Sequence, residues 1–253
     1  MENNPFSLAS KWAIVTGANT GLGQAMAISL AQAGANIILT GRSSCSETAE
    51  QVARTGREVH EINTDLGDKN SWATLIDDAH QHSGRLDILV NNAGIIRRND
   101  ALEFEESDWD DVMDINLKSV FFLSQAFAKK AVDQGYPAKI VNIASLLSYQ
   151  GGIRVASYTA SKSGVMGLTR ILANEWSGKS INVNAIAPGY FSTNNTTALR
   201  SDEQRNKEIL ARIPSGRWGD PADLGGAAVF LASAASDYVN GITLPVDGGW
   251  LAR

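Results

Sequence analysis

The sequence predicts an α/β domain in which a parallel sheet carries helices on both faces. Short apolar runs alternate with longer helical patterns along the whole chain, and a turn of small residues joins the first run to the first helix. No repeat, low-complexity linker or charge block divides the chain. Such alternation is typical of β-α-β units, whose strands pair in parallel. A length of 253 residues then makes one domain over 1–253 the simplest organisation.

The elements follow in a regular order. The apolar run WAIVTG (12–17) predicts a buried strand, and AMAISLAQAGA (25–35) predicts a helix that ends at Gly34. The remaining predicted strands are 36–41, 57–65, 86–94, 138–145, 180–189 and 241–249, and the longest helical patterns are 108–134 and 156–177. Right-handed crossovers between these strands give a doubly wound, Rossmann-type sheet.

The segment 190–220 interrupts this rhythm. It is polar, and only one short helical pattern is visible in it. Long loops in compact domains are usually functional lids or disordered segments. Because 190–220 follows the carboxyl end of a strand, where α/β sheets bind ligands, we expect it to cover a substrate. The alternative is a passive insertion.

Composition narrows the functional classes. The net charge is −5, which argues against a nucleic-acid partner, because such proteins need a basic face. The single Cys45 cannot form an internal disulfide, and the acidic N-terminus has no apolar run of signal-peptide length. The longest nearly apolar run, 224–235, is shorter than a membrane span. We therefore expect a cytoplasmic protein without a membrane partner.

The histidines do not predict a metal site. His80 and His82 are two residues apart, which turns them away from each other on a helix, and neither these nor His60 has a cysteine nearby. We expect surface positions for them and no metal.

The stretch TGANTGLG (16–23) predicts a phosphate-binding turn. Gly17, Gly21 and Gly23 lie between the first strand and the first helix. Small residues let the backbone approach a pyrophosphate, and the helix N-terminus supplies N–H donors and a positive dipole. The alternative is a tight turn with no ligand. The strand–turn–helix context favours a dinucleotide.

The end of the second strand bears on the type of dinucleotide. A carboxylate there usually binds the ribose 2′-hydroxyl of NAD, whereas an arginine accommodates the 2′-phosphate of NADP. The sequence LTGRSS has Arg42 and no acidic residue, which favours NADP(H). The alternative is that Arg42 stacks on the adenine or faces solvent, which leaves NAD(H) open.

Tyr158 and Lys162 form a candidate acid/base pair within SYTASKSG (157–164). In a helix, residues four apart share a face, and an ammonium group beside a phenol lowers the phenol's pKa from about 10. The product would be an acid/base that works near neutral pH. Taken alone, this spacing also suits an ordinary exposed helix.

Five ordered motifs resemble the short-chain dehydrogenase/reductases from end to end. They are TGANTGLG, NNAG (91–94), Asn116, Ser145 and YTASK (158–162), with PGYFST (188–193) and VDGG (246–249) in support. Within that family, NNAGIIRRNDALEF, QGGIRVASYTASKSGVMG, LANEWS, PGYFSTNNT and RIPSGRWG resemble bacterial members that act on deoxy-keto sugar acids in pectin and uronate breakdown. That group is usually described as NAD-linked, and Arg42 departs from what strict use of NAD implies.

The resemblance implies roles for residues that match the motifs. Tyr158 exchanges a proton with the substrate oxygen, Lys162 assists it and binds the nicotinamide ribose, Ser145 stabilises the oxygen, and Asn116 holds a relay water. The residues implied in cofactor binding are Gly17, Asn19, Gly21, Leu22, Gly23, Arg42, Asp65, Leu66, Asn92, Ala93, Gly94, Tyr158, Lys162, Pro188, Gly189 and Thr193. Asp65 is expected at the adenine, and the last three are expected at the nicotinamide carboxamide.

The substrate end rests on residue chemistry. A sugar acid carries a carboxylate, which arginine binds in a bidentate manner, and amides bind sugar hydroxyls. The candidates are Arg97, Arg98, Gln150, Arg154, Asn194 and Asn195. The alternative is that these arginines are solvated or contact another subunit.

Two other functions are open, and the resemblance also implies a partner. A 3-oxoacyl-thioester reductase of the same fold would dock an acidic carrier, for which Lys129, Lys130 and Arg170 are the available cations. A non-catalytic dinucleotide sensor could lose Tyr158 or Lys162, yet both are present. The family usually forms homotetramers through its long helices, here 108–134 and 156–177.

Overall fold

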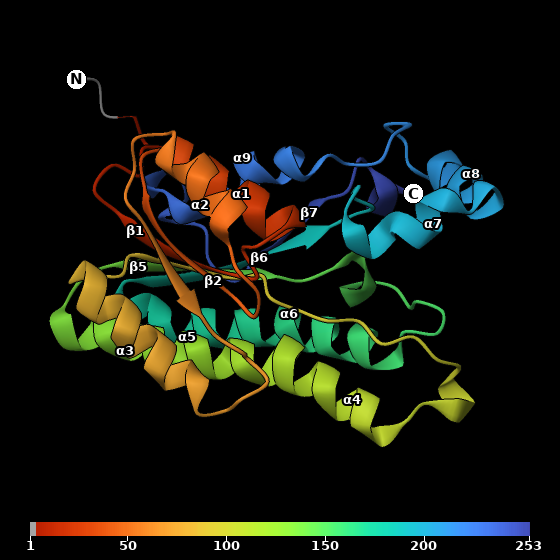
Figure 1. The fold of residues 1–253 in the computed structure, drawn as a ribbon, viewed down its shortest axis with the longest axis horizontal. Helices are drawn as coiled ribbons and strands as arrows, with labels where there is room; N and C mark the ends of the chain where they lie inside the picture. Colours follow the sequence, from red (N-terminus) through yellow and green to blue (C-terminus); the bar gives the residue numbers. More distant parts are fainter. Residues whose placement is uncertain (1–3) are drawn as a thin grey trace.

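A computed structural model describes residues 4–253, so the first residues of the acidic N-terminus lie outside it. Seven parallel strands form one sheet in the order β3-β2-β1-β4-β5-β6-β7 (Figure 1). The strands are β1 Trp12–Thr16, β2 Asn36–Gly41, β3 Val59–Asn63, β4 Ile88–Asn91, β5 Ala138–Ile143, β6 Ile181–Pro188 and β7 Thr243–Val246. The predicted doubly wound sheet is confirmed.

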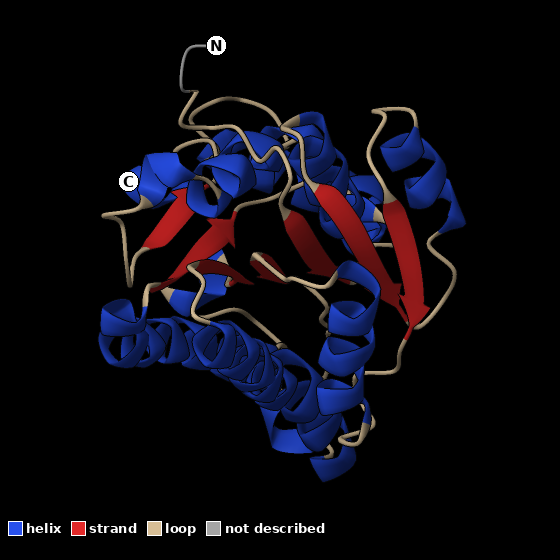
Figure 2. Ribbon diagram, turned by 90° about the vertical axis from the view of Figure 1, so that its left-hand side faces the viewer, coloured by secondary structure: helices blue, strands red, loops and turns tan. Residues whose placement is uncertain are grey.

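Helices cover both faces of the sheet, which Figure 2 shows as strands enclosed between two helical layers. The helices are α1 Gly21–Gln32, α2 Ser46–Ala53, α3 Ser71–Ser83, α4 Glu106–Met113, α5 Ser119–Gln134, α6 Ala156–Trp176, α7 Thr197–Ser201, α8 Glu203–Arg212 and α9 Gly225–Ala232. Helices α1, α2 and α9 lie on one face, and α3, α4, α5 and α6 lie on the other (Figure 1). Among the described residues, no helix is both long and apolar enough to cross a bilayer.

The strand sequences explain why both faces need cover. Side chains along a strand point alternately to opposite faces. In β1, Ala13 and Val15 enter the core cluster beneath α1 and α9, whereas Ile14 enters the cluster beneath α3 and α5. In β2, Ile37 and Ile38 divide in the same way. A strand that is apolar at every position is therefore buried on two sides, as parallel sheets require.

The topology places a switch point at the carboxyl ends of β1 and β4. From β1 the chain winds outward through β2 and β3, then returns to place β4 on the other side of β1. From β1 the chain therefore crosses to β2 on one side, whereas from β4 it crosses to β5 on the other side. Ligands of open α/β sheets bind at such a switch point.

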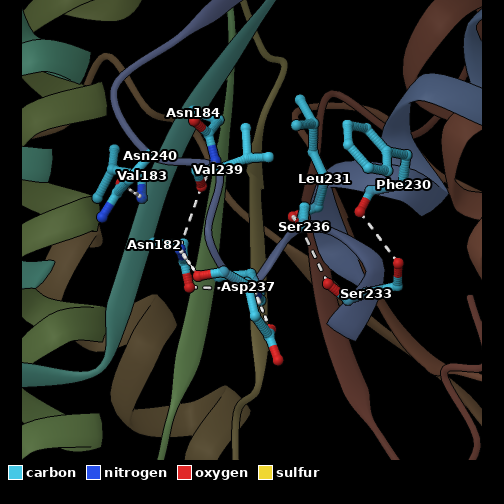
Figure 3. A network of polar contacts seen from close by, with 11 residues as sticks. Asn182, Val183, Asn184, Phe230, Leu231, Ser233, Ser236, Asp237, Val239 and Asn240 are labelled. Atoms are coloured by element: carbon cyan, nitrogen blue, oxygen red, sulfur yellow. Dashed lines mark hydrogen bonds and ion pairs between the residues drawn. The ribbon is translucent and has the colours of Figure 1, made fainter. Parts of the chain in front are cut away.

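The amino end of the sheet is hollow and has a polar network beside the hollow. A cavity of about 610 Å³ is lined there by residues that include Lys11, Asp87 and Lys139. Figure 3 shows the polar network beside it, in which the Asn182 amide donates to the main-chain carbonyls of Asp237 and Val239. These bonds tie the loop before β7 to β6, which is a structural role.

Candidate active site

The glycine turn after β1 forms a cradle that side chains would fill. Gly17 and Gly21 have φ of 62° and 60°, a backbone conformation that glycine adopts without strain. A Cβ on Gly23 would lie 2.1 Å from the Gly17 carbonyl oxygen. Thr20 precedes α1 and makes no side-chain cap, so the first N–H groups of α1 stay available to an anion. The turn fits a pyrophosphate.

Asn92 clamps this turn. Its Nδ2 donates to the carbonyls of Thr16 at 2.9 Å and Gly17 at 3.1 Å, and its backbone N–H donates to the Thr16 hydroxyl. The loop after β4 is thereby fixed to the loop after β1. This geometry gives Asn92 a supporting position, while Gly94 lies close to Asn116 and Lys162, whose Oδ1 and Nζ would be 3.1 Å and 3.8 Å from a Cβ built on it.

The loop after β2 presents a free cation. Arg42 is exposed and forms no ion pair with any carboxylate among residues 4–253. The loop is held from two sides, because the Asn19 Nδ2 donates to the Ser43 hydroxyl at 2.9 Å and the Cys45 N–H donates to Glu61 at 2.7 Å. The site therefore fits a phosphate near Arg42.

The predicted acid/base residues come together at the carboxyl ends of β5 and β6. Ser145 lies two residues beyond β5, and its Oγ accepts the Leu147 N–H at 3.2 Å. Tyr158 and Lys162 lie on α6, with the Lys162 Nζ 5.7 Å from the centre of the Tyr158 ring. That ammonium is 4 % exposed and donates to the Ile143 carbonyl at 2.6 Å.

The pKa of Tyr158 runs against the sequence-based expectation. Burial raises it above its ordinary value, while the Ser145 hydroxyl and the Arg98 guanidinium oppose the rise. Burial also lowers the pKa of Lys162 to about 8, so this lysine holds its charge weakly. Lys162 was expected to depress the pKa of the phenol, and in the protein alone it does not. Tyr158 is consequently protonated at neutral pH, which suits a proton donor.

Asn116 lies in a π-helical segment, Asp114–Lys118, between α4 and α5. The helical pattern predicted over 108–134 is an unbroken helical run in the structure, and its only departure from α geometry among the described residues is this π segment. The side chain is fully buried, and Ile95 engages both of its ends: the Ile95 N–H donates to Oδ1, and Nδ2 donates to the Ile95 carbonyl, each at 2.8 Å. Because the amide is used in this way, it fixes the loop after Gly94. A water relay at Asn116 remains a prediction.

The residues predicted for the two ends of a dinucleotide lie along the same edge. Gly189 follows β6, and a Cβ there would lie 2.6 Å from the Asp247 Cα. Thr193 lies against Gly21, since a Cβ built on that glycine would be 3.6 Å from the Thr193 Cγ2. At the other end, Asp65 accepts the Gly67 N–H in a tight turn, and the neighbouring Leu66 is buried.

The three arginines predicted to bind the substrate differ in whether their guanidinium groups are already paired within the protein. Arg97 forms ion pairs with Asp108 and Asp111 on α4, each at 3.0 Å, so its guanidinium is already occupied. Arg98 is exposed and close enough to Tyr158 to act on its pKa. The exposed Arg154 has φ of 63°, and its carbonyl accepts the Asn99 N–H. Arg98 has the best-placed positive charge.

The amide candidates also separate. The Gln150 Oε1 accepts bonds from Arg212 at 3.1 Å and from the Trp250 indole at 3.2 Å. Gln150 therefore joins the loop after β5 to α8 and the C-terminus. Asn194 and Asn195 are exposed at the start of the segment before α7.

The segment 190–220 holds two helices where the sequence showed one short pattern. Asp202 separates α7 from α8, because its backbone is extended and its side chain caps α8 by accepting the Arg205 N–H. Ile209 of α8 and Ile213, which follows α8, share a buried cluster with Trp250 and with Leu146, the neighbour of Ser145. Figure 1 shows α7, α8 and the C-terminus together.

Two arginines of this segment escaped the sequence analysis. Arg212 stacks over the Trp250 ring at 4.1 Å, and the Arg200 Nη2 donates to the Thr193 carbonyl at 3.1 Å. No motif marks either residue, because both contacts depend on how the segment folds back. The seven-residue separation of Arg200 from Thr193, two helical turns, is the only signal of proximity in the sequence.

Comparison with known proteins agrees with this geometry. A family profile described as enoyl-(acyl carrier protein) reductase matches residues 17–251. The chain is 60 % identical over 250 residues to the 2-dehydro-3-deoxy-D-gluconate 5-dehydrogenase of Dickeya dadantii, covering 99 % of both chains. It is 63 % identical over 248 residues to the Escherichia coli protein of the same name, covering 98 % of both.

Solved structures are equally similar. A putative 2-deoxy-D-gluconate 3-dehydrogenase from Agrobacterium tumefaciens with bound NADP is 59 % identical, with a TM-score of 0.95 and coverage of 99 % of this chain and 100 % of that one. A gluconate 5-dehydrogenase from Burkholderia cenocepacia in complex with NADP and tartrate is 38 % identical, with a TM-score of 0.93 and coverage of 99 % and 98 %.

Proposed function

This chain belongs to the short-chain dehydrogenase/reductase family, and from that membership we propose that it interconverts a ketone and a secondary alcohol on a deoxy-keto sugar acid. The substrate pair we propose is 2-dehydro-3-deoxy-D-gluconate and its 2,5-diketo product. The observation that carries the proposal is the grouping of Ser145, Tyr158 and Lys162, with the Lys162 Nζ 3.8 Å from a Cβ built on Gly94, in the loop that Asn92 ties to the glycine turn. Relatives at 60 % and 63 % identity named for this reaction support the choice of substrate.

The proposed chemistry places one proton transfer on Tyr158. During reduction the phenol donates its proton to the carbonyl oxygen, and during oxidation the phenolate removes the proton from the hydroxyl. Ser145 donates a hydrogen bond to the same oxygen as negative charge develops on it. Lys162, with a pKa of about 8, can return a proton to Tyr158 or take one from it. A bound nicotinamide dinucleotide supplies or accepts the hydride.

We propose NADP(H) as the preferred cofactor. The glycine cradle and the uncapped N–H groups of α1 suit the pyrophosphate. Arg42 is exposed without a carboxylate partner among the described residues, and Asn19 holds its neighbour Ser43 in place. Two solved relatives hold NADP, which supports the same preference.

We propose Arg98 as the residue that binds the substrate carboxylate. Its charge already acts on Tyr158, so a carboxylate bound there would lie near the reacting oxygen. A carboxylate would also partly neutralise Arg98 and so weaken its effect on the phenol. Asn194 and Asn195 remain our candidates for the sugar hydroxyls, and 190–220 remains our candidate lid.

A cytoplasmic homotetramer is the assembly and location we propose. Apolar side chains that a lone chain leaves partly exposed lie on the expected helices: Trp109, Phe122, Val132 and Ile171. Burying such side chains between subunits favours association. Light scattering coupled to gel filtration measures the assembly, and a monomeric mass at working concentration would contradict it.

The test of function is an absorbance assay for reduced nicotinamide. NADPH and NADH are run in parallel, each with 2,5-diketo-3-deoxygluconate and with an acetoacetyl thioester. We expect turnover of the sugar acid and faster turnover with NADPH. Turnover of the thioester alone would replace the sugar acid with an acyl substrate on the same residues. Binding of a cofactor without turnover of either substrate would favour a sensor.

A further inference from the structure

Arg200 carries the one buried nitrogen of the lid that no described residue satisfies. Its Nη2 donates to the Thr193 carbonyl at 3.1 Å and weakly to the Thr197 hydroxyl, while its Nε is buried without a partner among residues 4–253. A buried donor left in this state destabilises the protein, because its desolvation is not compensated by a hydrogen bond. Such a group points to a missing acceptor.

The charge of Arg200 is also unbalanced. The other arginines of the segment have their own partners: Arg205 pairs with Glu208, Arg217 pairs with Asp223, and Arg212 stacks on Trp250. Arg200 has no carboxylate within ion-pair distance among the described residues. An arginine that is half-buried and unpaired is available to an anionic ligand.

The position of Arg200 identifies which anion. The carbonyl that it holds belongs to Thr193, and the Thr193 side chain lies against Gly21 at the start of α1. The N–H groups of α1 are uncapped there, and Gly17 and Gly21 leave room for a ligand. A pyrophosphate is the anion that suits this cradle.

We propose that Arg200 is a cofactor-binding residue that neutralises the pyrophosphate of the dinucleotide from the lid side. The inference rests on the proposed function. It gives the lid a direct role in holding the cofactor, because α1 would offer N–H donors to the anion and α7 would offer the cation of Arg200. Arg42 then serves the adenosine 2′-phosphate, and Arg200 serves the phosphates common to NAD and NADP.

Isothermal titration with two ligands tests the division of labour. NADPH contains both the 2′-phosphate and the pyrophosphate, whereas adenosine 2′-monophosphate contains only the former. We expect Arg200→Gln to weaken NADPH binding about tenfold to hundredfold and to leave adenosine 2′-monophosphate within about twofold. Arg200→Lys, which keeps the charge, should be intermediate. Arg205→Gln, on exposed α8, is the matched control and should change neither affinity.

The outcomes separate clearly. Glutamine can still donate to the Thr193 carbonyl, so unchanged NADPH affinity in Arg200→Gln would reduce Arg200 to a structural strap and overturn the inference. Equal losses for both ligands would also overturn it, because they would indicate collapse of the whole site. Failure of the unaltered protein to bind either NADPH or NADH would instead remove the proposed function itself.

Discussion

The amino and carboxyl ends of the sheet both carry buried charged or polar side chains, but the partners of these side chains differ. At the amino end, Asp87 accepts bonds from Lys11, Arg85 and the Trp12 N–H, and Lys139 pairs with Asp237. At the carboxyl end, the buried Lys162 has no carboxylate within ion-pair distance among the described residues. The phenol of Tyr158 there is held in its neutral form by burial.

Buried side-chain atoms without a hydrogen-bond partner also distinguish the amino-end cavity from other parts of the molecule. The buried side-chain atoms without a partner among residues 4–253 are Thr40 Oγ1, Asn91 Oδ1, Ser157 Oγ, Thr159 Oγ1, Arg200 Nε and Thr243 Oγ1. None lines the amino-end cavity, and Ser157 and Thr159 flank Tyr158. Among the described residues, no buried unpaired atom therefore marks a ligand site in the amino-end cavity, whereas each unpaired buried atom elsewhere needs a partner such as a water or a ligand.

Removal of the phenolic oxygen of Tyr158 gives the strongest test of the comparison between the two ends of the sheet. We expect Tyr158→Phe to lower kcat about 10²–10⁴-fold, because the general acid is lost. NADPH affinity measured by titration should change little. Tyr136→Phe is the control, since it removes a hydroxyl that accepts the Leu86 N–H at the amino end. Near-normal turnover by Tyr158→Phe would contradict the proposed mechanism.

Alanine substitution of Gly23, compared with the same substitution at a control glycine, tests the cradle that the turn after β1 forms. In Gly23→Ala the new Cβ would meet the Gly17 carbonyl at 2.1 Å, so the backbone must move. We expect a loss of about 3 kcal/mol in the free energy of unfolding and at least tenfold weaker NADPH binding. Gly226→Ala, at an exposed position of α9 outside the proposed interface helices, meets nothing within 4 Å and should stabilise by about 0.5–1 kcal/mol. Denaturant unfolding with NADPH titration measures both, and a Gly23→Ala variant with normal affinity would refute the cradle.

At the amino end, stability and activity should separate. Asp87→Asn removes a 4 % exposed carboxylate that binds two cations and one N–H. We expect a loss of about 2 kcal/mol, or roughly 4–8 °C in Tm, with kcat and NADPH affinity unchanged. A fall in kcat at temperatures where the variant stays folded would show that the amino end takes part in function.

The periodic parts of the fold could be predicted from the sequence, and the interruptions could not. Strand and helix order followed from apolar runs such as WAIVTG, because burial on two faces demands them. The π-helical segment at Asn116 could not be foreseen from the apolar pattern, and the Asn116 amide within it is bonded to Ile95, a residue outside the helix. The break at Asp202 likewise depends on a cap that was not recognised.

The residues of the candidate site also divide into those that could be predicted from the sequence and those that could not. Tyr158 and Lys162 were predictable because their spacing on one helix fixes their proximity. Arg97 and Gln150 were assigned to the substrate by residue type, yet the folded chain gives them Asp108 and Trp250 as partners. Residue chemistry identifies what a side chain can bind. Only the three-dimensional arrangement shows whether a partner in the protein already occupies it.

A variant of Lys162 gives the test with the smallest expected effect on stability. It is also the most specific test, because the substitution should stabilise the fold while it abolishes turnover. The pKa of Lys162 is about 8 in the folded protein and about 10.5 when unfolded, so the folded state binds fewer protons between these values. The contribution of Lys162 to the free energy of unfolding of the unaltered protein therefore increases as the pH rises from about 8 to 10.5, and it is lowest below pH 8. Lys162→Met removes a desolvated cation and should stabilise by about 1–2 kcal/mol at pH 7, after loss of the bond to the Ile143 carbonyl.

The advantage of Lys162→Met should shrink as pH rises through that window, because the lysine of the unaltered protein is then neutral. Thermal unfolding of both proteins from pH 7 to 10 measures the difference, in which other titrating groups cancel. Turnover should be lost in the same variant at every pH. A destabilised Lys162→Met at pH 7 would mean that the buried ammonium stabilises the free protein, and the contrast between the two ends of the sheet would then fail at its central residue.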